Sequence, residues 1–242
     1  MSTATLTERR DWAPGLATFR LDAAPDFEAG QFFNFGVDTP EGPIRRSYSA
    51  ASAPGEPLEF YVTAVPGGAL TPSLFDLAVG SSLELDPKPQ GFFTLKYMPQ
   101  TRDAWLLATG TGLGPFISML RGTALWQHFE RVFLVHGVRE RAHFAYAEEL
   151  QQLAAKRGNF RYLRAVSRDA AAADEVAGRI PAAFADGRIQ ALAGAELEPE
   201  RCHVLLCGNP QMIDDTHEAL KPLGLVKHRV RKPGHISSEK YW

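Results

Sequence analysis

The chain changes its hydrophobic rhythm near Arg102, and this change limits the possible folds more than any other feature of the sequence. Before Arg102, short apolar or alternating runs are broken by Gly and Pro, as at residues 16–21, 31–37, 58–65 and 82–85. Short strands with frequent turn signals indicate an antiparallel barrel or sandwich. Thr71 followed by Pro72 predicts one interrupting helix over 71–77, with Thr71 as its N-cap.

After Arg102 the pattern alternates between strand and helix. The expected strands cover residues 104–108, 132–138, 162–166 and 203–206. The expected helices cover residues 115–126, 145–157, 180–192 and 211–223. Such alternation is typical of a parallel sheet covered by helices. The 242 residues suit two domains, which we place at 1–99 and 100–242.

Composition excludes several functional classes. The net charge of −2 gives no overall basic field for nucleic acid or an anionic membrane. The two cysteines, Cys202 and Cys207, are too few for an iron–sulfur cluster, and their opposite strand parity argues against a disulfide. No apolar run approaches the roughly 20 residues of a membrane span, and the N-terminus lacks the apolar core of a signal peptide. We therefore expect a cytoplasmic protein without a metal site, in which any redox group is a bound organic cofactor.

The tetrapeptide Arg46-Ser47-Tyr48-Ser49 places a cation, a flat ring and hydroxyl groups within one expected strand. In an extended strand Arg46 and Tyr48 project from one face, and Ser47 and Ser49 from the other. A cation beside an aromatic ring suits the phosphates and ring system of a flavin nucleotide. The same alternation is also ordinary in a half-exposed strand, so the tetrapeptide alone leaves both interpretations open.

Two turns in the second half follow expected strands and open expected helices. The first is Gly110-Thr111-Gly112-Leu113-Gly114-Pro115, and the second is Cys207-Gly208-Asn209-Pro210-Gln211-Met212. Ligands of open α/β sheets bind at the carboxyl ends of strands, so both turns are expected to open on one crevice. A plain tight turn explains the glycines equally well, and Cys207 also suits the role of a small buried hydrophobe.

Three arginines follow expected strands of the second half. Arg168 comes directly after Ser167, Arg179 lies eleven positions later, and Arg139 ends the preceding strand. Guanidinium groups bind phosphate in a fixed fork, so this set suits a ribose 2′-phosphate. Solvated surface arginines are the alternative.

The C-terminal segment carries the one clear basic run, Lys227-His228-Arg229-Val230-Arg231-Lys232. Residues 221–242 hold six Lys and Arg against one acid, Glu239. This run suits either a solvated edge strand or a docking face for an acidic protein. The chain then ends on Tyr241-Trp242, two aromatic rings for which a stacked resting place is expected.

In order and spacing, these motifs resemble the ferredoxin–NADP reductase family, and within it the bacterial ferredoxin (flavodoxin) type. Further motifs that carry the resemblance are Gly30-Gln31-Phe32, Gly68-Ala69-Leu70-Thr71, Gly91-Phe92-Phe93, Gly178-Arg179-Ile180-Pro181 and Arg231-Lys232-Pro233-Gly234-His235. The resemblance covers nearly the whole chain. It implies an FAD-binding antiparallel β-barrel followed by an NADP-binding α/β domain with a parallel sheet.

The resemblance also implies roles for residues of the first domain. Arg46 would meet the flavin pyrophosphate, Tyr48 would stack on the isoalloxazine ring, and Ser49 would lie near flavin N5. The FAD site would be completed by Ser47, Tyr61, Ala69, Leu70 and Thr71, the last three at the FAD phosphates. Tyr241 and Trp242 would form a C-terminal lid over FAD.

For the second domain, the resemblance implies that Thr111 lines the crevice for flavin and nicotinamide, with Cys207 close by. Arg139, Arg168 and Arg179 would bind the 2′-phosphate. The rest of the NADP site would be Ser167, Asn209, Pro210 and Gln211. We expect Ser49, Cys207 and Tyr241 to lie nearest the reaction.

The implied function is that of an FAD-dependent oxidoreductase. It would transfer hydride from NADPH to FAD and pass single electrons, reversibly, to ferredoxin or flavodoxin. The acidic carrier would dock on the basic C-terminal face of a monomer. Two alternatives remain open: a reductase of the same fold for free flavin, quinone or an oxygenase partner, and a noncatalytic flavoprotein that responds to NADP.

Overall fold

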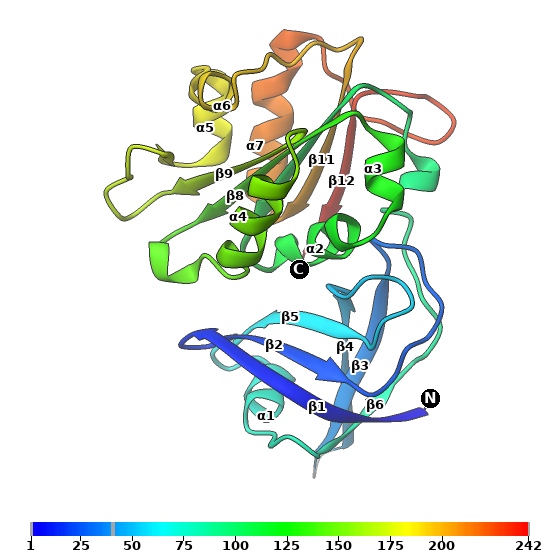
Figure 1. Ribbon diagram of the computed structural model, residues 1–242. Helices are drawn as coiled ribbons and strands as arrows, with labels where there is room; N and C mark the ends of the chain where they lie inside the picture. Colours follow the sequence, from blue (N-terminus) through cyan, green and yellow to red (C-terminus); the bar gives the residue numbers. More distant parts are fainter. Residues whose placement is uncertain (1, 40–41, 242) are drawn as a thin grey trace. The chain divides into compact units, whose positions relative to one another are not determined.

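The computed structural model describes residues 2–39 and 42–241. By their internal contacts they form two compact units, which are described separately below (Figure 1). Unit 1 comprises Met1–Thr94 and Gly114–Gly122, and unit 2 comprises Leu95–Leu113 and Thr123–Trp242.

Unit 1 is an antiparallel sheet of six strands in the order β4-β3-β6-β1-β2-β5. The strands are β1 (Ser2–Ala13), β2 (Leu16–Leu21), β3 (Phe32–Thr39), β4 (Gly42–Ser49), β5 (Glu59–Thr63) and β6 (Ser82–Leu85). The two outer strands meet, since Ala50 bridges to Phe60 and the N–H of Ala51 donates to the carbonyl of Glu59 at 2.7 Å. The sheet therefore curls round on itself, which confirms the expected antiparallel barrel.

The core of unit 1 is aromatic. Phe33, Phe35 and Phe60 are fully buried, and the rings of Phe35 and Phe60 lie 4.5 Å apart between centroids. Such rings bury large apolar areas and fix one another's orientation, so they hold the strands of the barrel in register. The interior is therefore filled by side chains that the alternating pattern of residues 31–37 predicts.

Helix α2 (Gly114–Arg121) packs with unit 1 through a buried ion pair. Glu59 on β5 is only 4% exposed, and it accepts from Arg121 at 3.0 Å and from Arg20 at 2.8 Å. A buried carboxylate left without partners would be costly, so the ion pairs with the two guanidiniums stabilise Glu59, and the one with Arg121 ties α2 to the barrel.

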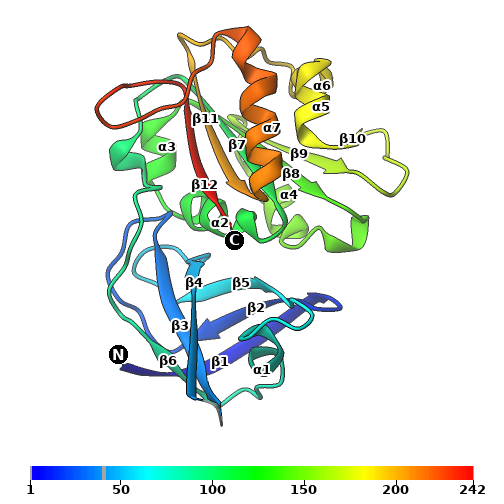
Figure 2. The ribbon, with the colours of Figure 1, turned by 180° about the vertical axis from the view of Figure 1, so that it is seen from behind.

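Unit 2 is a parallel sheet in the order β10-β9-β8-β7-β11-β12. Its strands are β7 (Asp103–Thr109), β8 (Arg131–Val138), β9 (Phe160–Val166), β10 (Glu175–Ala177), β11 (Cys202–Gly208) and β12 (Ile236–Lys240). Helices α3 (Ala124–His128) and α4 (Ala147–Lys156) cover the face that is in front in Figure 1. Helices α5 (Ile180–Ala185), α6 (Arg188–Ala193) and α7 (Pro210–Leu220) cover the other face, which Figure 2 shows in front. The order reverses between β7 and β11, so a ligand site is expected at the carboxyl ends of these two strands.

The core of unit 2 is built on Trp105, which is fully buried in β7. Its ring stacks on Phe133 of β8 at 4.3 Å, and Phe184 of α5 meets its edge at 5.8 Å. These contacts join two strands and one helix in a single apolar cluster. The cluster fixes the central strands, and with them the loops at their ends.

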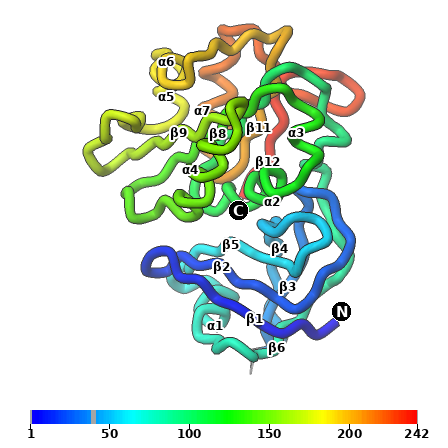
Figure 3. The backbone as a smooth tube through the Cα atoms, viewed as in Figure 1, coloured from blue at the N-terminus to red at the C-terminus, as the bar shows by residue number. Residues whose placement is uncertain are grey.

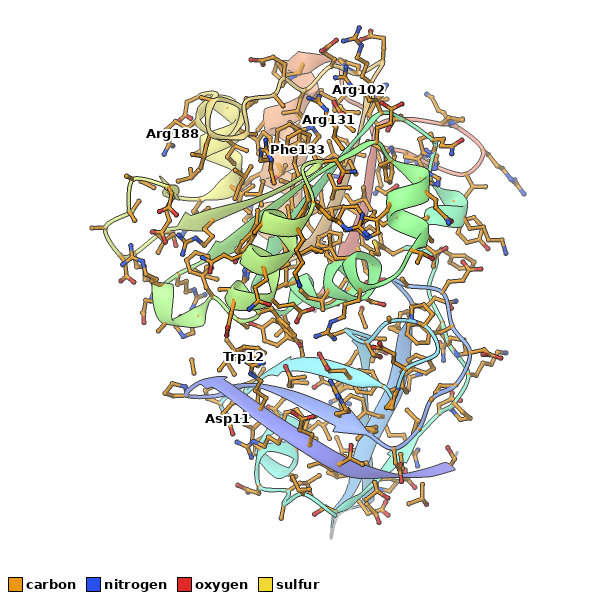
Figure 4. All side chains as sticks on the ribbon, viewed as in Figure 1. Asp11, Trp12, Arg102, Arg131, Phe133 and Arg188 are labelled. Carbon is orange, nitrogen blue, oxygen red and sulfur yellow. The ribbon has the colours of Figure 1, made fainter. Side chains whose placement is uncertain are left out.

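The amino end of β7 carries a charged cluster. Asp103 is 1% exposed and accepts two hydrogen bonds from Arg131 at 2.7 and 2.6 Å and two from Arg102 at 3.1 and 2.9 Å. Burial alone would raise the pKa of Asp103, but the hydrogen bonds from Arg131 and Arg102 outweigh it and lower that pKa. Arg102 and Arg131 lie close together in Figure 4. This cluster sits at the edge of the sheet opposite the carboxyl ends.

The expected strands are confirmed, but two expected helices are interrupted. The helix predicted over 115–126 is two helices, α2 and α3, separated at Gly122 and Thr123. The helix predicted over 180–192 is likewise α5 and α6, because Gly187 between them adopts a φ of 79°, which a right-handed helix does not allow. Apolar periodicity continues across both breaks, so the sequence pattern alone suggested single helices.

Two expected helix starts are wrong. Tyr146 has a left-handed φ of 57°, so α4 begins at Ala147 rather than at 145, after the 3₁₀ helix η3 (Arg141–His143). Helix α1 (Thr71–Phe75) has Leu70, not Thr71, as its N-cap. The Thr71 hydroxyl instead accepts from the N–H of Val65 at 2.9 Å, and it donates to the carbonyl of Val65 at 3.3 Å. Thr71 therefore holds the preceding turn rather than the helix end.

The basic run at 227–232 is a loop, which corrects the edge strand that was one of its two interpretations. It lies between the 3₁₀ helix η4 (Lys221–Leu223) and β12, and Arg229 and Lys232 pair across its tight end. Figure 3 traces it in red away from the sheet of unit 2. Since the loop precedes β12, it lies at the amino end of that strand. The edge strand itself is β12, which the sequence pattern did not predict.

Within residues 2–39 and 42–241, no helix is both long and apolar enough to cross a membrane. In the same residues no three His, Cys, Asp or Glu side chains gather as a metal ion would require. Cys202 and Cys207 are both buried free thiols, as the parity of their positions predicts.

Candidate functional site

The Arg46-Ser47-Tyr48-Ser49 tetrapeptide forms the end of β4, which pairs with β3. The register sets Tyr48 opposite Phe33 and Ser47 opposite Asn34, so alternate residues use opposite faces as expected. The Ser47 hydroxyl donates to the side-chain oxygen of Asn34 at 2.6 Å. Ser47 is thereby held to the neighbouring strand.

Tyr48 is half-buried against the barrel core. Its ring lies 4.7 Å from that of Phe35, with 36° between the planes. Burial raises the pKa of Tyr48 to about 12, although the positive charge of Arg46 opposes that rise. The phenol is therefore neutral at physiological pH, and its ring is held at a fixed tilt on an aromatic support.

Arg46 is exposed, and one of its terminal nitrogens donates to the carbonyl of Arg45 at 2.7 Å. Among the described residues its guanidinium has no carboxylate partner. The N–H groups of Ala69 and Leu70, just before α1, likewise donate to no acceptor in that part of the chain. A charged fork and two unpaired N–H groups are donors of the kind that phosphate oxygens accept from.

Ser49 and Tyr61 are both buried in unit 1 and come close to one point of the backbone. A Cβ atom added at Gly114 would lie 3.7 Å from the carbonyl oxygen of Ser49 and 3.9 Å from Cβ of Tyr61. Unit 1 therefore brings Ser49 and Tyr61 together with the start of α2.

In unit 2 the two glycine-containing turns lie side by side at the carboxyl ends of β7 and β11, as expected. A Cβ atom at Gly112 would lie 2.4 Å from the carbonyl oxygen of Cys207, closer than atoms approach. The N–H of Asn209 donates to the Thr109 hydroxyl at 3.1 Å and joins the turns a second time. Gly112 is thus required by a close backbone approach, and Thr111, beside it in η2 (Gly110–Leu113), takes its position from that contact.

This close approach yields a testable prediction. Gly112→Ala is expected to lower the free energy of unfolding by about 3 kcal/mol, because a methyl group must displace the backbone at Cys207. Gly158→Ala is the matched control, since a Cβ there meets no atom within 4 Å and its φ is not positive. Urea unfolding followed by tryptophan fluorescence measures both variants, and equal losses would contradict this account of the turn.

Cys207 and the C-terminal Tyr241 are brought together by unit 2. The N–H of Tyr241 donates to the carbonyl of Gly208 at 3.0 Å. Burial raises the pKa of the Cys207 thiol well above its usual range, the charge of Glu239 raises it further, and a hydrogen bond with Tyr241 lowers it in part. The thiol is therefore protonated at neutral pH and offers a neutral polar group rather than a nucleophile. Trp242, the other expected lid residue, lies outside the described residues.

The three predicted phosphate-binding arginines lie at the carboxyl ends of neighbouring strands. The N–H of Arg168 donates to the carbonyl of Arg139 at 2.8 Å, and the N–H of Gly178, before Arg179, donates to that of Val166 at 2.8 Å. Ser167 joins the same edge through its hydroxyl, 3.3 Å from the carbonyl of Val138. Unit 2 therefore brings Arg139, Ser167, Arg168 and Arg179 to one edge of the sheet.

All three of these arginines are exposed. The carboxylate nearest to Arg168 is that of Glu140, at 4.0 Å, and both side chains are about half exposed or more. Among the described residues, the side chains of Arg139 and Arg179 form no ion pair. Exposed pairs of this length contribute little, so three positive charges remain available for an anion.

Asn209, Pro210 and Gln211 begin α7 at the same edge. The side-chain oxygen of Asn209 accepts from the N–H groups of Gln211 at 2.9 Å and Met212 at 3.2 Å, so Asn209 is the N-cap of α7. The Gln211 amide donates to Asp215 at 2.7 Å. These residues shape the edge through the helix start that they form.

One set of contacts at this edge was not anticipated. Arg141 forms a two-bond ion pair with the buried carboxylate of Glu175, on the strand next to Arg168. The two residues are 34 positions apart, and β10 is only three residues long, so no sequence periodicity predicts their contact. Only the folded sheet brings them together.

Comparison with known proteins shows which proteins this chain is similar to. The family described as the oxidoreductase NAD-binding domain matches residues 106–218. The flavodoxin/ferredoxin–NADP reductase of Escherichia coli K12 is 36% identical over 99% of this chain and 98% of its own. Ferredoxin–NADP reductase A of Sorangium cellulosum is 36% identical over 98% of this chain and 88% of its own. The solved ferredoxin NADP⁺ reductase of Neisseria gonorrhoeae, with bound FAD and NADP, has a TM-score of 0.93 at 30% identity, covering 99% of this chain and 98% of its own.

Proposed function

This chain belongs to the flavodoxin/ferredoxin–NADP reductase family, and we propose that it transfers hydride between NADPH and a bound FAD and exchanges single electrons with ferredoxin or flavodoxin. The observation that carries the proposal is the presence of two half-sites in one chain. Unit 1 offers a tilted aromatic ring and the exposed guanidinium of Arg46, which has no carboxylate partner among the described residues, and unit 2 offers three exposed arginines at the carboxyl edge of a parallel sheet.

The residues of unit 1 fit FAD. Arg46 would hold the pyrophosphate, since its guanidinium has no carboxylate partner among the described residues. The N–H groups of Ala69 and Leu70 would donate to phosphate oxygens next to Thr71, while Tyr48 would support the flavin ring. Ser49 and Tyr61 would line the same site, and Ser47 would steady the strand through Asn34. When bound, FAD supplies the chemistry that links two-electron and one-electron transfer, and the protein supplies its position and surroundings.

The residues of unit 2 fit NADP(H). Arg139, Arg168 and Arg179 would bind the 2′-phosphate, and Ser167 would complete that end of the site. Thr111 and the Asn209-Pro210-Gln211 turn would line the path along the edge, because Gly112 lets the two turns approach so closely. Cys207 and Tyr241 would lie at the reacting end, where the neutral thiol adds no charge. Trp242 would complete the C-terminal lid.

An acidic electron carrier would dock on the basic C-terminal segment. Lys240 lies at the carboxyl end of β12 and contacts Asp214 at 2.7 Å, whereas the basic loop at 227–232 lies at the amino end. Five residues of strand separate the two ends by roughly 16 Å. We therefore propose that the loop attracts the acidic carrier over a long range, and that electrons leave the protein at another point. The protein would act as a cytoplasmic monomer.

Steady-state turnover with purified carriers tests this function. Reduction of ferredoxin or flavodoxin by NADPH is expected to exceed reduction of free flavin in kcat/KM, as a carrier reductase requires. The double variant R231E/K232E is expected to lower kcat/KM for the carrier about tenfold at low salt and to lose that effect at high salt. Turnover of free flavin serves as the internal control and is expected to stay unchanged. Absence of carrier-coupled turnover would contradict the proposal and favour a free-flavin, quinone or oxygenase-partner reductase.

A further inference from the structure

Arg141 begins the 3₁₀ helix η3, two positions after Arg139. Its Nε donates to one oxygen of Glu175 at 3.2 Å, and one terminal nitrogen donates to the other oxygen at 2.7 Å. The same terminal nitrogen donates to the carbonyl of Ala170 at 2.8 Å, and the backbone N–H of Arg141 donates to Asp169 at 2.7 Å. Arg141, which follows β8, therefore contacts residues at both ends of the loop between β9 and β10.

Glu175 is the buried carboxylate on which these contacts converge. Its side chain is 0% exposed, and it also accepts from the N–H of Ala172 at 2.9 Å and faces Arg164 at 3.4 Å. Hydrogen bonds from Arg141 lower the pKa of Glu175 to about 2, against a smaller opposing effect of burial. The carboxylate is therefore charged throughout the physiological range and holds two guanidiniums on the β9–β10 edge.

The loop that Arg141 and Glu175 hold carries part of the proposed phosphate site. Arg168 begins the loop, and its N–H donates to the carbonyl of Arg139 at 2.8 Å. Arg179 follows β10, the strand on which Glu175 lies. Each of the three phosphate-site arginines is therefore within four residues of a member of the Arg141–Glu175 contact network, which also includes Asp169 and Ala170.

We propose that Arg141, through Glu175, is a positioning residue for 2′-phosphate recognition: it braces the 168–175 loop so that Arg139, Arg168 and Arg179 are already aligned when the nucleotide arrives. This inference rests on the proposed NADP(H) site. Exposed arginine side chains on a free loop would lose conformational entropy on binding a phosphate, and a loop braced in advance reduces that loss. The brace would therefore favour nucleotides that carry the 2′-phosphate over those that lack it.

Binding of two nucleotide probes tests the brace without reference to turnover. Isothermal titration calorimetry would compare 2′,5′-ADP, which carries the 2′-phosphate, with 5′-AMP, which does not. Arg141→Gln and Glu175→Gln are each expected to weaken 2′,5′-ADP binding about tenfold and 5′-AMP binding less than about twofold. Arg141→Lys keeps the charge but not the fork, so an intermediate loss is expected. Arg201→Gln is the matched control, because Arg201 is an exposed arginine paired with Glu198 at 3.2 Å at the opposite edge of the sheet.

The two glutamine variants also separate a brace from a direct contact. If Arg141 bound the phosphate itself, Glu175→Gln would free its guanidinium and leave 2′,5′-ADP binding unchanged or tighter, which would overturn the proposal. Both variants break the same contact. The double variant is therefore expected to bind 2′,5′-ADP at most about twofold more weakly than either single variant. Additive losses, or equal losses for both probes, would overturn the brace as well.

Two further outcomes have defined meanings. Thermal melts identify any variant that fails to fold. If Arg141→Gln fails, the single variants Arg141→Lys and Glu175→Gln are compared instead, since each keeps a side chain of similar length. If the unaltered protein itself shows no preference for 2′,5′-ADP over 5′-AMP, the proposed NADP(H) site is wrong. If that preference exists and Arg141→Gln retains it, the site stands and the brace is wrong.

Discussion

Replacing Arg168 and Arg179 together with alanine is expected to raise KM for NADPH about 100-fold, while KM for NADH changes less than about threefold. Each guanidinium would form charge-assisted hydrogen bonds with the 2′-phosphate, a group that NADH lacks. Both side chains are exposed, and Arg168 lies 4.0 Å from the half-exposed carboxylate of Glu140, so their removal leaves no buried partner unsatisfied among the described residues. The value of kcat with NADPH is expected to change little, because the 2′-phosphate is remote from the nicotinamide ring.

Arg201→Ala is the control for this pair of substitutions. Arg201 is also exposed and precedes β11 at the amino end, away from the carboxyl edge of the sheet. It is expected to leave both KM values unchanged. Equal increases for NADPH and NADH in the double variant would refute the assignment of these arginines to the 2′-phosphate.

Replacing Asp103 with alanine is expected to lower the free energy of unfolding of unit 2 by about 3 kcal/mol. The side chain is 1% exposed and accepts four hydrogen bonds from Arg102 and Arg131, so its loss leaves two neighbouring guanidiniums with only the more distant Glu198, 4.0 Å from Arg102, as an ion-pair partner among the described residues. Asp186→Ala is the control, because Asp186 forms an equally short ion pair with Arg188 at 2.7 Å, but at the surface. Its effect is expected to be much smaller, and urea unfolding followed by the fluorescence of the tryptophans measures both.

Asp103 also predicts how stability depends on pH. Its pKa is lower in the folded protein than in the unfolded chain, so its stabilising effect is complete above the ordinary carboxyl pKa of about 4. That effect is lost as the pH falls through the lower, folded value. The gap in stability between the unaltered protein and Asp103→Ala is therefore expected to be constant from pH 5 to pH 7 and to narrow below about pH 4. A gap that stays constant to pH 2 would contradict the ion-pair account.

Much of the fold could be predicted from hydrophobic period, because period depends on local burial. Strand β6 was predicted with its bounds at Ser82 and Leu85, and the parallel sheet followed from the alternation after Arg102. The helix breaks at 122–123 and 186–187 were missed because apolar residues continue in phase across both. Strand β12 was missed because its residues, Ile236–Lys240, are mostly polar and only its pairing with β11 makes it a strand.

Some contacts of the candidate site could likewise be predicted from the sequence, and others could not. The turns at Gly110 and Cys207 could be predicted to meet, because strand ends in a parallel sheet share an edge. The structure agrees, since a Cβ atom added at Gly112 would lie 2.4 Å from the carbonyl oxygen of Cys207. The contact between Thr71 and Val65 could not be predicted, since a threonine before a proline fits a helix cap equally well. The Arg141–Glu175 pair left no sequence signal either, because it depends on the register of β9 with β10.

Anaerobic mixing of the purified protein with NADPH is the most direct test of the central claim. A protein that holds FAD on unit 1 and NADPH on unit 2 is expected to lose the visible absorbance of oxidised flavin after one equivalent of NADPH, and to regain it when oxidised ferredoxin or flavodoxin is added. Bound flavin whose absorbance NADPH leaves unchanged would contradict the account and would indicate a noncatalytic flavoprotein.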